Sequence, residues 1–285
     1  MLKLKAPWNE RNGRFSILKL VVFLGLFAPA AWIVYQAATG MLDPKPVTEM
    51  IHRTGDWTVR FILLSLLVTP LRRLAQWPKL IAVRRMLGVA AFAYAFAHLS
   101  LYVVDQKYNI PHVASEIVLR FYLTIGFVAW LGLAALSATS TDAMIRRLGA
   151  QRWNRLHKLI YGIAVLAIFH FYLQSKADVS EPVLMTGLYF ILMLARLLQA
   201  RAWPAWRIAI AVAIVAPIAT ALVEATWYAV MRHIDFWEVL SANFDPDMAP
   251  SASQLVALAG LAVIVVAVAR NWRARKPSAV LVGAK

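Results

Sequence analysis

The chain consists of long apolar stretches separated by short polar or charged segments. Eight stretches approach or exceed the roughly 20 residues that a helix needs to cross the hydrocarbon core of a bilayer. They cover about residues 17–38, 57–71, 86–104, 119–138, 156–173, 183–200, 207–231 and 252–270. The second stretch is the shortest and must begin near Trp57 to cross. The pattern predicts an all-α, polytopic membrane bundle of eight helices.

Composition supports this fold class. Of 285 residues, 61% are hydrophobic and 15% charged, and the mean hydropathy is +0.63, which excludes an ordinary soluble domain. Cysteine is absent, which excludes disulfides, iron–sulfur ligation and covalent attachment of a c-type haem. The N-terminus is basic, but the first apolar stretch lacks a small-residue cleavage site, so we expect a retained membrane span rather than a signal peptide.

The distribution of charge predicts an orientation. With a cytoplasmic N-terminus, most of the 30 Lys and Arg residues fall on the cytoplasmic side, and nearly all of the 14 acidic residues fall on the other. Positive residues gather on the cytoplasmic side of membrane proteins, so both termini are predicted to be cytoplasmic. Basic clusters within residues 72–85, 146–158 and 270–276 are expected to contact lipid headgroups. The net charge of +16 therefore does not indicate nucleic-acid binding.

Two histidines lie inside predicted spans at matching depth. His98 falls near the outer end of the third stretch and His170 near the outer end of the fifth. Ionisable side chains inside a membrane are costly and often functional. Two imidazoles on facing helices can supply both axial ligands of a b-type haem. Buried structural histidines, or a proton relay, are the alternatives.

His157 lies at the inner end of the fifth stretch, about 20 Å from His170 at 1.5 Å per helical residue. A second haem there would need a partner on the third stretch, but the matching positions hold Arg84 and Arg85, which are not haem ligands. One haem is the simpler prediction. His157 could instead hydrogen-bond a quinone, a flavin or a lipid phosphate.

Four other ionisable residues are weaker candidates. His52, His112 and His233 fall in or beside outer loops, where solvation is expected. Glu224, in the seventh stretch, is interpreted either as a residue near the outer headgroups or, with the two buried histidines, as part of a proton path in a haem-free transporter. Motifs for nucleotide binding are absent, so electrons are expected from quinol or from a separate flavin enzyme.

Three segments of the chain form a recognisable set, namely 69–73 (TPLRR), 84–88 (RRMLG) and 139–149 (TSTDAMIRRLG), together with Tyr94, His98, Trp153, His157 and His170. In these positions the chain resembles the MsrQ (YedZ) family of haem-binding membrane subunits. The resemblance covers roughly residues 15–200. The last two predicted spans extend beyond it.

The resemblance implies a ferric-reductase-like domain over residues 1–200, followed by an extension, 201–285, that carries two more spans. It implies b haem held by His98 and His170, a third functional histidine at His157, and FMN. The family passes electrons from the quinone pool or a cytoplasmic flavin reductase to the periplasmic molybdopterin subunit MsrP. On this basis the chain is a bacterial inner-membrane electron-transfer subunit and not the sulfoxide-reducing subunit. A stand-alone ferric reductase of similar fold is the alternative.

Overall fold

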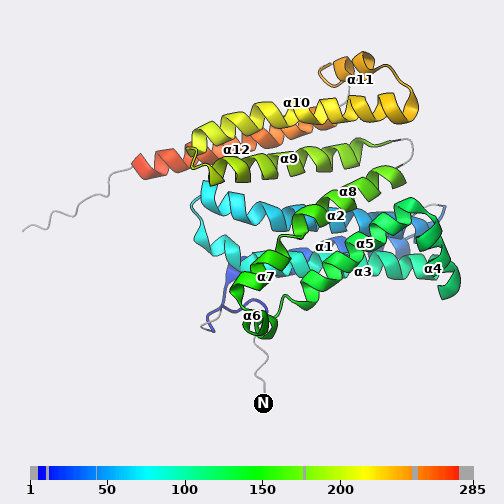
Figure 1. Ribbon diagram of the computed structural model, residues 1–285. Helices are drawn as coiled ribbons and strands as arrows, with labels where there is room; N and C mark the ends of the chain where they lie inside the picture. Colours follow the sequence, from blue (N-terminus) through cyan, green and yellow to red (C-terminus); the bar gives the residue numbers. More distant parts are fainter. Residues whose placement is uncertain (1–5, 11–12, 43, 176–177, 246–249, 276–285) are drawn as a thin grey trace, which may run out of the picture. The chain divides into compact units, whose positions relative to one another are not determined.

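The computed structural model describes residues 6–10, 13–42, 44–175, 178–245 and 250–275, and side chains as far as Arg270 (Figure 1). Nearly all of this part is helical, which confirms the predicted all-α class. The helices are α1 (Ile17–Ala38), α2 (Pro46–Leu74), the 3₁₀ helix η1 (Pro78–Val83), α3 (Arg84–Asp105), α4 (Ile110–Leu119), α5 (Phe121–Ala138), α6 (Asp142–Leu148), α7 (Ala150–His157), α8 (Ile160–Gln174), α9 (Ser180–Ala200), α10 (Ala205–Arg232), α11 (Phe236–Ala242) and α12 (Ala252–Arg275).

Within the described residues, seven helical segments are long and apolar enough to cross a membrane. These are α1, η1 with α3, α5, α7 with α8, α9, α10 and α12. The chain is therefore a polytopic membrane protein. Helix α2 has 29 residues, but its interior carries Asp56 and Arg60, and it is not among the seven. The count of eight spans stays a prediction, as does the position of the termini, because residues 1–5 and 276–285 lie outside the described part.

Helix α2 extends beyond the second predicted stretch. It starts at Pro46, before Trp57, and polar residues on its first turns pair with one another. Arg53 pairs with Glu49 one turn earlier, at 3.0 Å, and such pairs stabilise a helix without apolar side chains. His52 consequently lies in this helix rather than in a loop, although it is exposed.

The fifth predicted stretch is two helices rather than one. Helix α7 ends at His157, and α8 begins at Ile160 after a short turn. Helix α4 was not predicted. Its N-cap residue, Asn109, accepts a hydrogen bond from the His112 amide, and Pro111 occupies its first turn, where proline is well tolerated. Pro111 therefore lies in the first turn of a new helix, whereas α3 already ends at Asp105.

The chain forms two compact units, Met1–Val68 with Ile81–Ala177, and Thr69–Leu80 with Asp178–Lys285. In the second unit, α9, α10 and α12 pack side by side (Figure 1). The domain boundary predicted after residue 200 follows the extent of the family resemblance and stays a prediction. By packing, α9 lies with the C-terminal helices.

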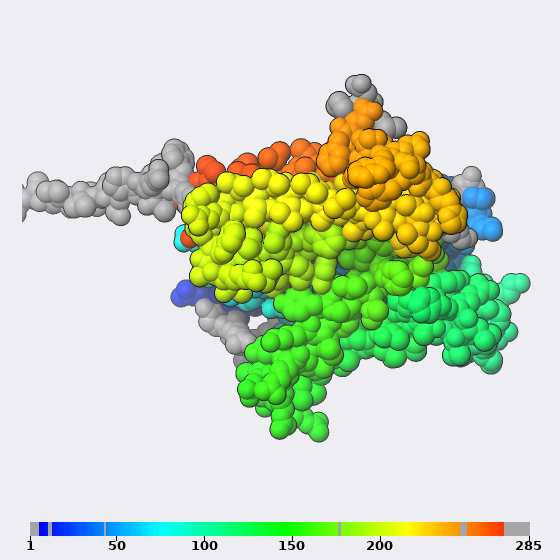
Figure 2. All heavy atoms as spheres, turned by 45° about the horizontal axis from the view of Figure 1, so that its top comes forward, coloured from blue at the N-terminus to red at the C-terminus, as the bar shows by residue number. Residues whose placement is uncertain are grey.

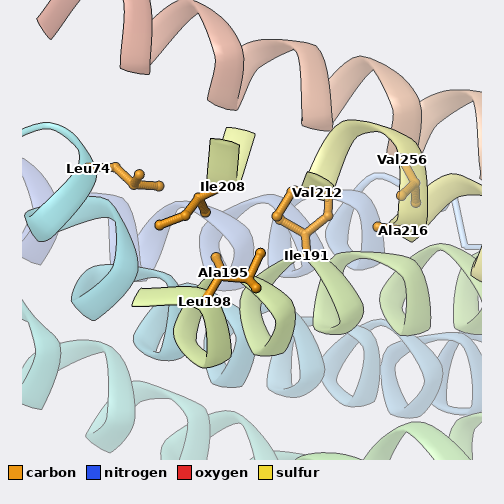
Figure 3. Close-up of a cluster of buried hydrophobic side chains, with 8 residues drawn as sticks. All are labelled: Leu74, Ile191, Ala195, Leu198, Ile208, Val212, Ala216 and Val256. Carbon is orange, nitrogen blue, oxygen red and sulfur yellow. The ribbon is translucent and has the colours of Figure 1, made fainter. Parts of the chain in front are cut away.

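Aliphatic side chains fill the core of the second unit (Figure 3). The cluster consists of Leu74, Ile191, Ala195, Leu198, Ile208, Val212, Ala216 and Val256. The helices around this core approach one another closely at Gly187, where an added Cβ would lie 2.3 Å from Val256 and 2.4 Å from Thr220. Figure 2 shows the surface of α10, with α11 at its C-terminal end.

In the first unit, Tyr94 joins α3 to α1. Its hydroxyl accepts a hydrogen bond from the Ala30 amide at 2.9 Å and donates to the Leu26 carbonyl at 2.8 Å. In a regular α-helix these two backbone groups would bond to each other. The tyrosine is therefore inserted into the α1 hydrogen-bond ladder next to Pro29, which fixes α3 one turn before His98.

Candidate functional site

His98, on α3, is held against α2. Its Nδ1 lies 2.7 Å from the Ile51 carbonyl oxygen. A carbonyl oxygen only accepts hydrogen bonds, so Nδ1 carries the proton and Nε2 keeps a free lone pair. The ring lies over Gly55, where an added Cβ would be 3.1 Å from Nδ1. The absence of a side chain at Gly55 makes room for the imidazole.

His170, on α8, is held against α5 in the same way. Its Nδ1 lies 2.8 Å from the Tyr122 carbonyl oxygen, and the ring lies over Gly126. A Cβ at Gly126 would be 2.8 Å from two ring atoms, which is tighter than ordinary van der Waals contact. Real Cβ atoms do not approach so closely, so any side chain there would displace the ring.

The two histidines share one local design. In each, the carbonyl that accepts from Nδ1 comes four residues before the glycine that faces the ring: Ile51 before Gly55, and Tyr122 before Gly126. Residues four apart lie on the same face of a helix. Metal-ligating histidines usually donate their second ring nitrogen to a carbonyl or a carboxylate, which fixes the ring and its tautomer. Both side chains are thus prepared to coordinate through Nε2.

The fold brings these two rings together, as their matched depth predicted. Their centroids are 6.3 Å apart, and their planes are at 88° to each other. Two imidazoles that bind one metal ion from opposite sides have ring centres roughly 6 Å apart, because each metal–nitrogen bond is about 2 Å long. The observed separation fits a single metal ion between the two rings.

The donor set fits haem better than a bare ion. Among the described residues, no group of three or more His, Cys, Asp or Glu side chains could hold a metal ion. A site with two histidines suits a metal whose remaining ligands come from a macrocycle. One turn beyond Gly126, the Trp130 indole Nε1 is buried without a partner, which leaves a donor for a polar group of a cofactor.

His157 has a different environment. Its Nδ1 lies 3.1 Å from the Trp153 carbonyl oxygen, and its Nε2 lies 3.3 Å from the Ser140 hydroxyl. Nδ1 is thus tied to a carbonyl, as in the other two histidines, whereas Nε2 makes only a long contact with a hydroxyl that itself donates to the Leu136 carbonyl at 2.7 Å. Trp153 stacks on the imidazole with centroids 3.7 Å apart and donates from Nε1 to the Thr139 carbonyl at 2.8 Å.

Local sequence explains this arrangement. Thr141 caps α6 by accepting from the Met144 amide, and Gly149, with φ of +75°, lets the chain turn from α6 into α7. Arg85 pairs with Asp142 at 2.7 Å, which ties the start of α3 to the start of α6. Arg84 and Arg85 add positive charge near His157. The result is an aromatic and basic cluster at the opposite end of α8 from His170.

Sequence reasoning missed three contributors, namely Gly55, Gly126 and Trp130. The spacing of four residues between carbonyl and glycine is visible only once the histidine's partner helix is known. His52, His112 and His233 are exposed, as expected for solvated side chains. Glu224 is buried within the protein, with only 9% of it exposed.

Comparisons with known proteins agree with these features. Residues 54–168 match the family profile described as "Ferric reductase like transmembrane component". The chain is similar to proteins named "Protein-methionine-sulfoxide reductase heme-binding subunit MsrQ". The relative from Xanthomonas oryzae pv. oryzae (strain MAFF 311018) is 40% identical over 198 residues, which cover 67% of this chain and 87% of the relative.

Two further relatives carry the same name. The protein of Xanthomonas campestris pv. campestris (strain 8004) is 43% identical over 65% of this chain and 85% of its own length. That of Herminiimonas arsenicoxydans is 35% identical over 66% and 87%, respectively. No solved structure matches the chain significantly. In each case the match covers most of the relative but only about two thirds of this chain, so about one third of this chain lies outside the matched region.

Proposed function

The chain belongs to the MsrQ family, and from that premise we propose that it is a b-type haem membrane subunit that carries electrons to a methionine sulfoxide reductase. The observation that carries the proposal is the His98–His170 pair, with both Nδ1 atoms tied to carbonyls and ring centroids 6.3 Å apart. The name that the relatives share adds haem binding and a methionine sulfoxide reductase system.

In this proposal His98 and His170 hold the haem iron through Nε2. A bound haem supplies one-electron chemistry by alternating between ferric and ferrous iron. The Ile51 and Tyr122 carbonyls accept from the two Nδ1–H groups, which raises the basicity of both ligands. Gly55 and Gly126 allow the rings to lie directly on α2 and α5.

The finer assignments follow the family resemblance. We propose that the acceptor is the periplasmic molybdopterin subunit MsrP, and that the donor is the quinone pool or a cytoplasmic flavin reductase. We place the protein in the bacterial inner membrane with both termini cytoplasmic. FMN stays a prediction of the resemblance, to which no residue is assigned.

We further propose that His157 and the arginines near it receive the electron donor. Quinols and flavins are planar and carry polar oxygens, which suit an aromatic, basic cluster with a hydrogen-bonding imidazole. From α3, Arg84 and Arg85 act electrostatically on His157, and neither can ligate haem iron, so the residue is assigned to hydrogen bonding and proton handling rather than to a second haem.

A reduced-minus-oxidised visible spectrum of the purified protein, with pyridine haemochrome quantification, tests the main proposal. We expect a low-spin b-type signal and close to one haem per chain. Two haems per chain would contradict the assignment of His157. A colourless protein from haem-replete cells would favour the transporter, and ferric iron reduction that needs no partner subunit would favour a stand-alone ferric reductase.

A further inference from the structure

The second compact unit contains a buried carboxyl group that the electron-transfer proposal does not use. Glu224, on α10, has 9% of its surface exposed, and its Oε2 is buried without a hydrogen-bond partner. Asn243, which ends α11, is 3% exposed, and its Oδ1 is also buried without a partner. Two buried acceptor oxygens without hydrogen bonds cost free energy, so we expect a hydrogen-bond donor within reach of both.

The side chains of Glu224 and Asn243 are hydrogen-bonded to each other. The Asn243 amide nitrogen also donates to the Val239 carbonyl at 3.2 Å. An amide nitrogen has two hydrogens, so these two contacts use both. The Asn243 backbone is fixed as well, because its carbonyl accepts from the hydroxyls of Ser251, at 2.9 Å, and Ser253, at 3.2 Å.

The charged surroundings disfavour an ionised Glu224. Asp178 acts on it electrostatically. The Ser180 amide and hydroxyl donate to Asp178 and lower the pKa of that carboxyl, so Asp178 stays negative. Tyr228, one turn along α10, is uncharged at neutral pH, and the positive charge of Arg232 acts on Tyr228. No Lys or Arg forms an ion pair with Glu224 in the described part of the chain.

We propose that Glu224 binds a proton and forms a cyclic acid–amide pair with Asn243. In this pair the Asn243 nitrogen donates to one carboxyl oxygen, while the protonated Oε2 donates to Asn243 Oδ1. One proton thus satisfies both unpaired oxygens. A buried carboxyl without a cationic partner usually becomes neutral. The extension therefore carries a proton-binding site that is chemically separate from the His98–His170 pair.

Infrared spectroscopy of the full-length protein tests this assignment. The protonated carboxyl should give a C=O stretching band above the amide I region that shifts to lower frequency in D₂O. Glu224→Gln should remove this band, because the glutamine amide can pair with Asn243 but carries no acid. Glu238→Gln, which alters an exposed carboxyl on α11, should leave the band intact.

A second variant identifies the partner. Asn243→Ala should keep the acid but shift its band to higher frequency, because the carboxyl loses both hydrogen bonds to the amide. An identical carboxylic-acid region in the wild type and in Glu224→Gln at neutral pH would overturn the proposal. Loss of the wild-type band on adding Na⁺ or K⁺ would also overturn it, in favour of a cation site. If Glu224→Gln does not fold, an unchanged band in Asn243→Ala alone excludes the pair.

Discussion

The imidazole rings of His98 and His170 lie with their centroids 6.3 Å apart and their planes at 88°. A hydrogen bond fixes the orientation of each ring, because each Nδ1 donates to a backbone carbonyl on a different neighbouring helix. The separation of the rings is therefore set by helix packing. A carbonyl oxygen has two lone pairs, so each carbonyl can hold an imidazole ring and still accept a hydrogen bond within its own helix.

The two histidines should be equally necessary for the haem. We expect His98→Ala and His170→Ala each to abolish the low-spin haem spectrum, because one axial ligand leaves the iron with an open position. The measurement is the reduced visible spectrum together with haem content per chain. The exposed His112 on α4 provides the control, and His112→Ala should keep a full haem signal. A normal low-spin spectrum in both ligand variants would refute the assignment.

The glycines that face the rings should differ in their sensitivity to substitution. Gly126→Ala should lower haem occupancy and shift the midpoint potential, because its Cβ would meet His170 at 2.8 Å. Overpacking of this kind costs about 1–3 kcal/mol. Gly55→Ala should have a smaller effect, since its contact with His98 is 3.1 Å. Redox titration of the haem measures both.

Gly162, on the same helix as His170, offers a matched control for these substitutions. An added Cβ there meets no atom within 4 Å, so Gly162→Ala should leave the potential and the spectrum unchanged. Equal effects of Gly126→Ala and Gly162→Ala would mean that helix propensity, rather than contact with the imidazole, explains the change.

Much of this fold could be predicted from the sequence because membrane spans are set by apolar length. The predicted start of α1 at residue 17 agrees with the structure. The matched depth of His98 and His170 predicted that their rings would lie close together, as they do. The start of α2 could not be predicted in this way, since its first turns mix polar residues such as Glu49 and Arg53 with the buried Ile51.

The details of the site depend on which helices pack together, and a single sequence does not give this information. Gly126 became recognisable only when His170 was found against α5, and Trp130 only when its indole nitrogen proved to be buried and unpartnered. Glu224 was interpreted as a residue near the headgroups because it lies near the end of a span. Its hydrogen-bond partner, Asn243, lies on the far side of the next helix, at the end of α11.

The C-terminal helices should be stabilised by close packing at Gly187. Gly187→Ala would place a Cβ 2.3 Å from Val256 and 2.4 Å from Thr220, so we expect a loss of about 1–3 kcal/mol in the free energy of unfolding of the second unit. Thermal unfolding in detergent measures this change. The His98–His170 pair lies in the first unit, so haem content should persist. Gly25→Ala on α1, where a Cβ meets nothing, is the control.

His157 should affect the rate of electron entry rather than haem binding. The proposed haem ligands are His98 and His170, so His157→Ala should retain the low-spin spectrum. If the imidazole hydrogen-bonds the donor, its removal should slow reduction of the haem by quinol or reduced flavin about tenfold, which corresponds to ~1.4 kcal/mol, the worth of one hydrogen bond to a polar ligand. Stopped-flow reduction at saturating and limiting donor concentrations separates donor binding from electron transfer.

The control is His233, an exposed histidine at the end of α10, and His233→Ala should behave as the wild type. If His157→Ala keeps both the haem and the wild-type reduction rate, the donor binds elsewhere, and the contacts of His157 with Ser140 and Trp153 serve only to join α7 to the end of α5.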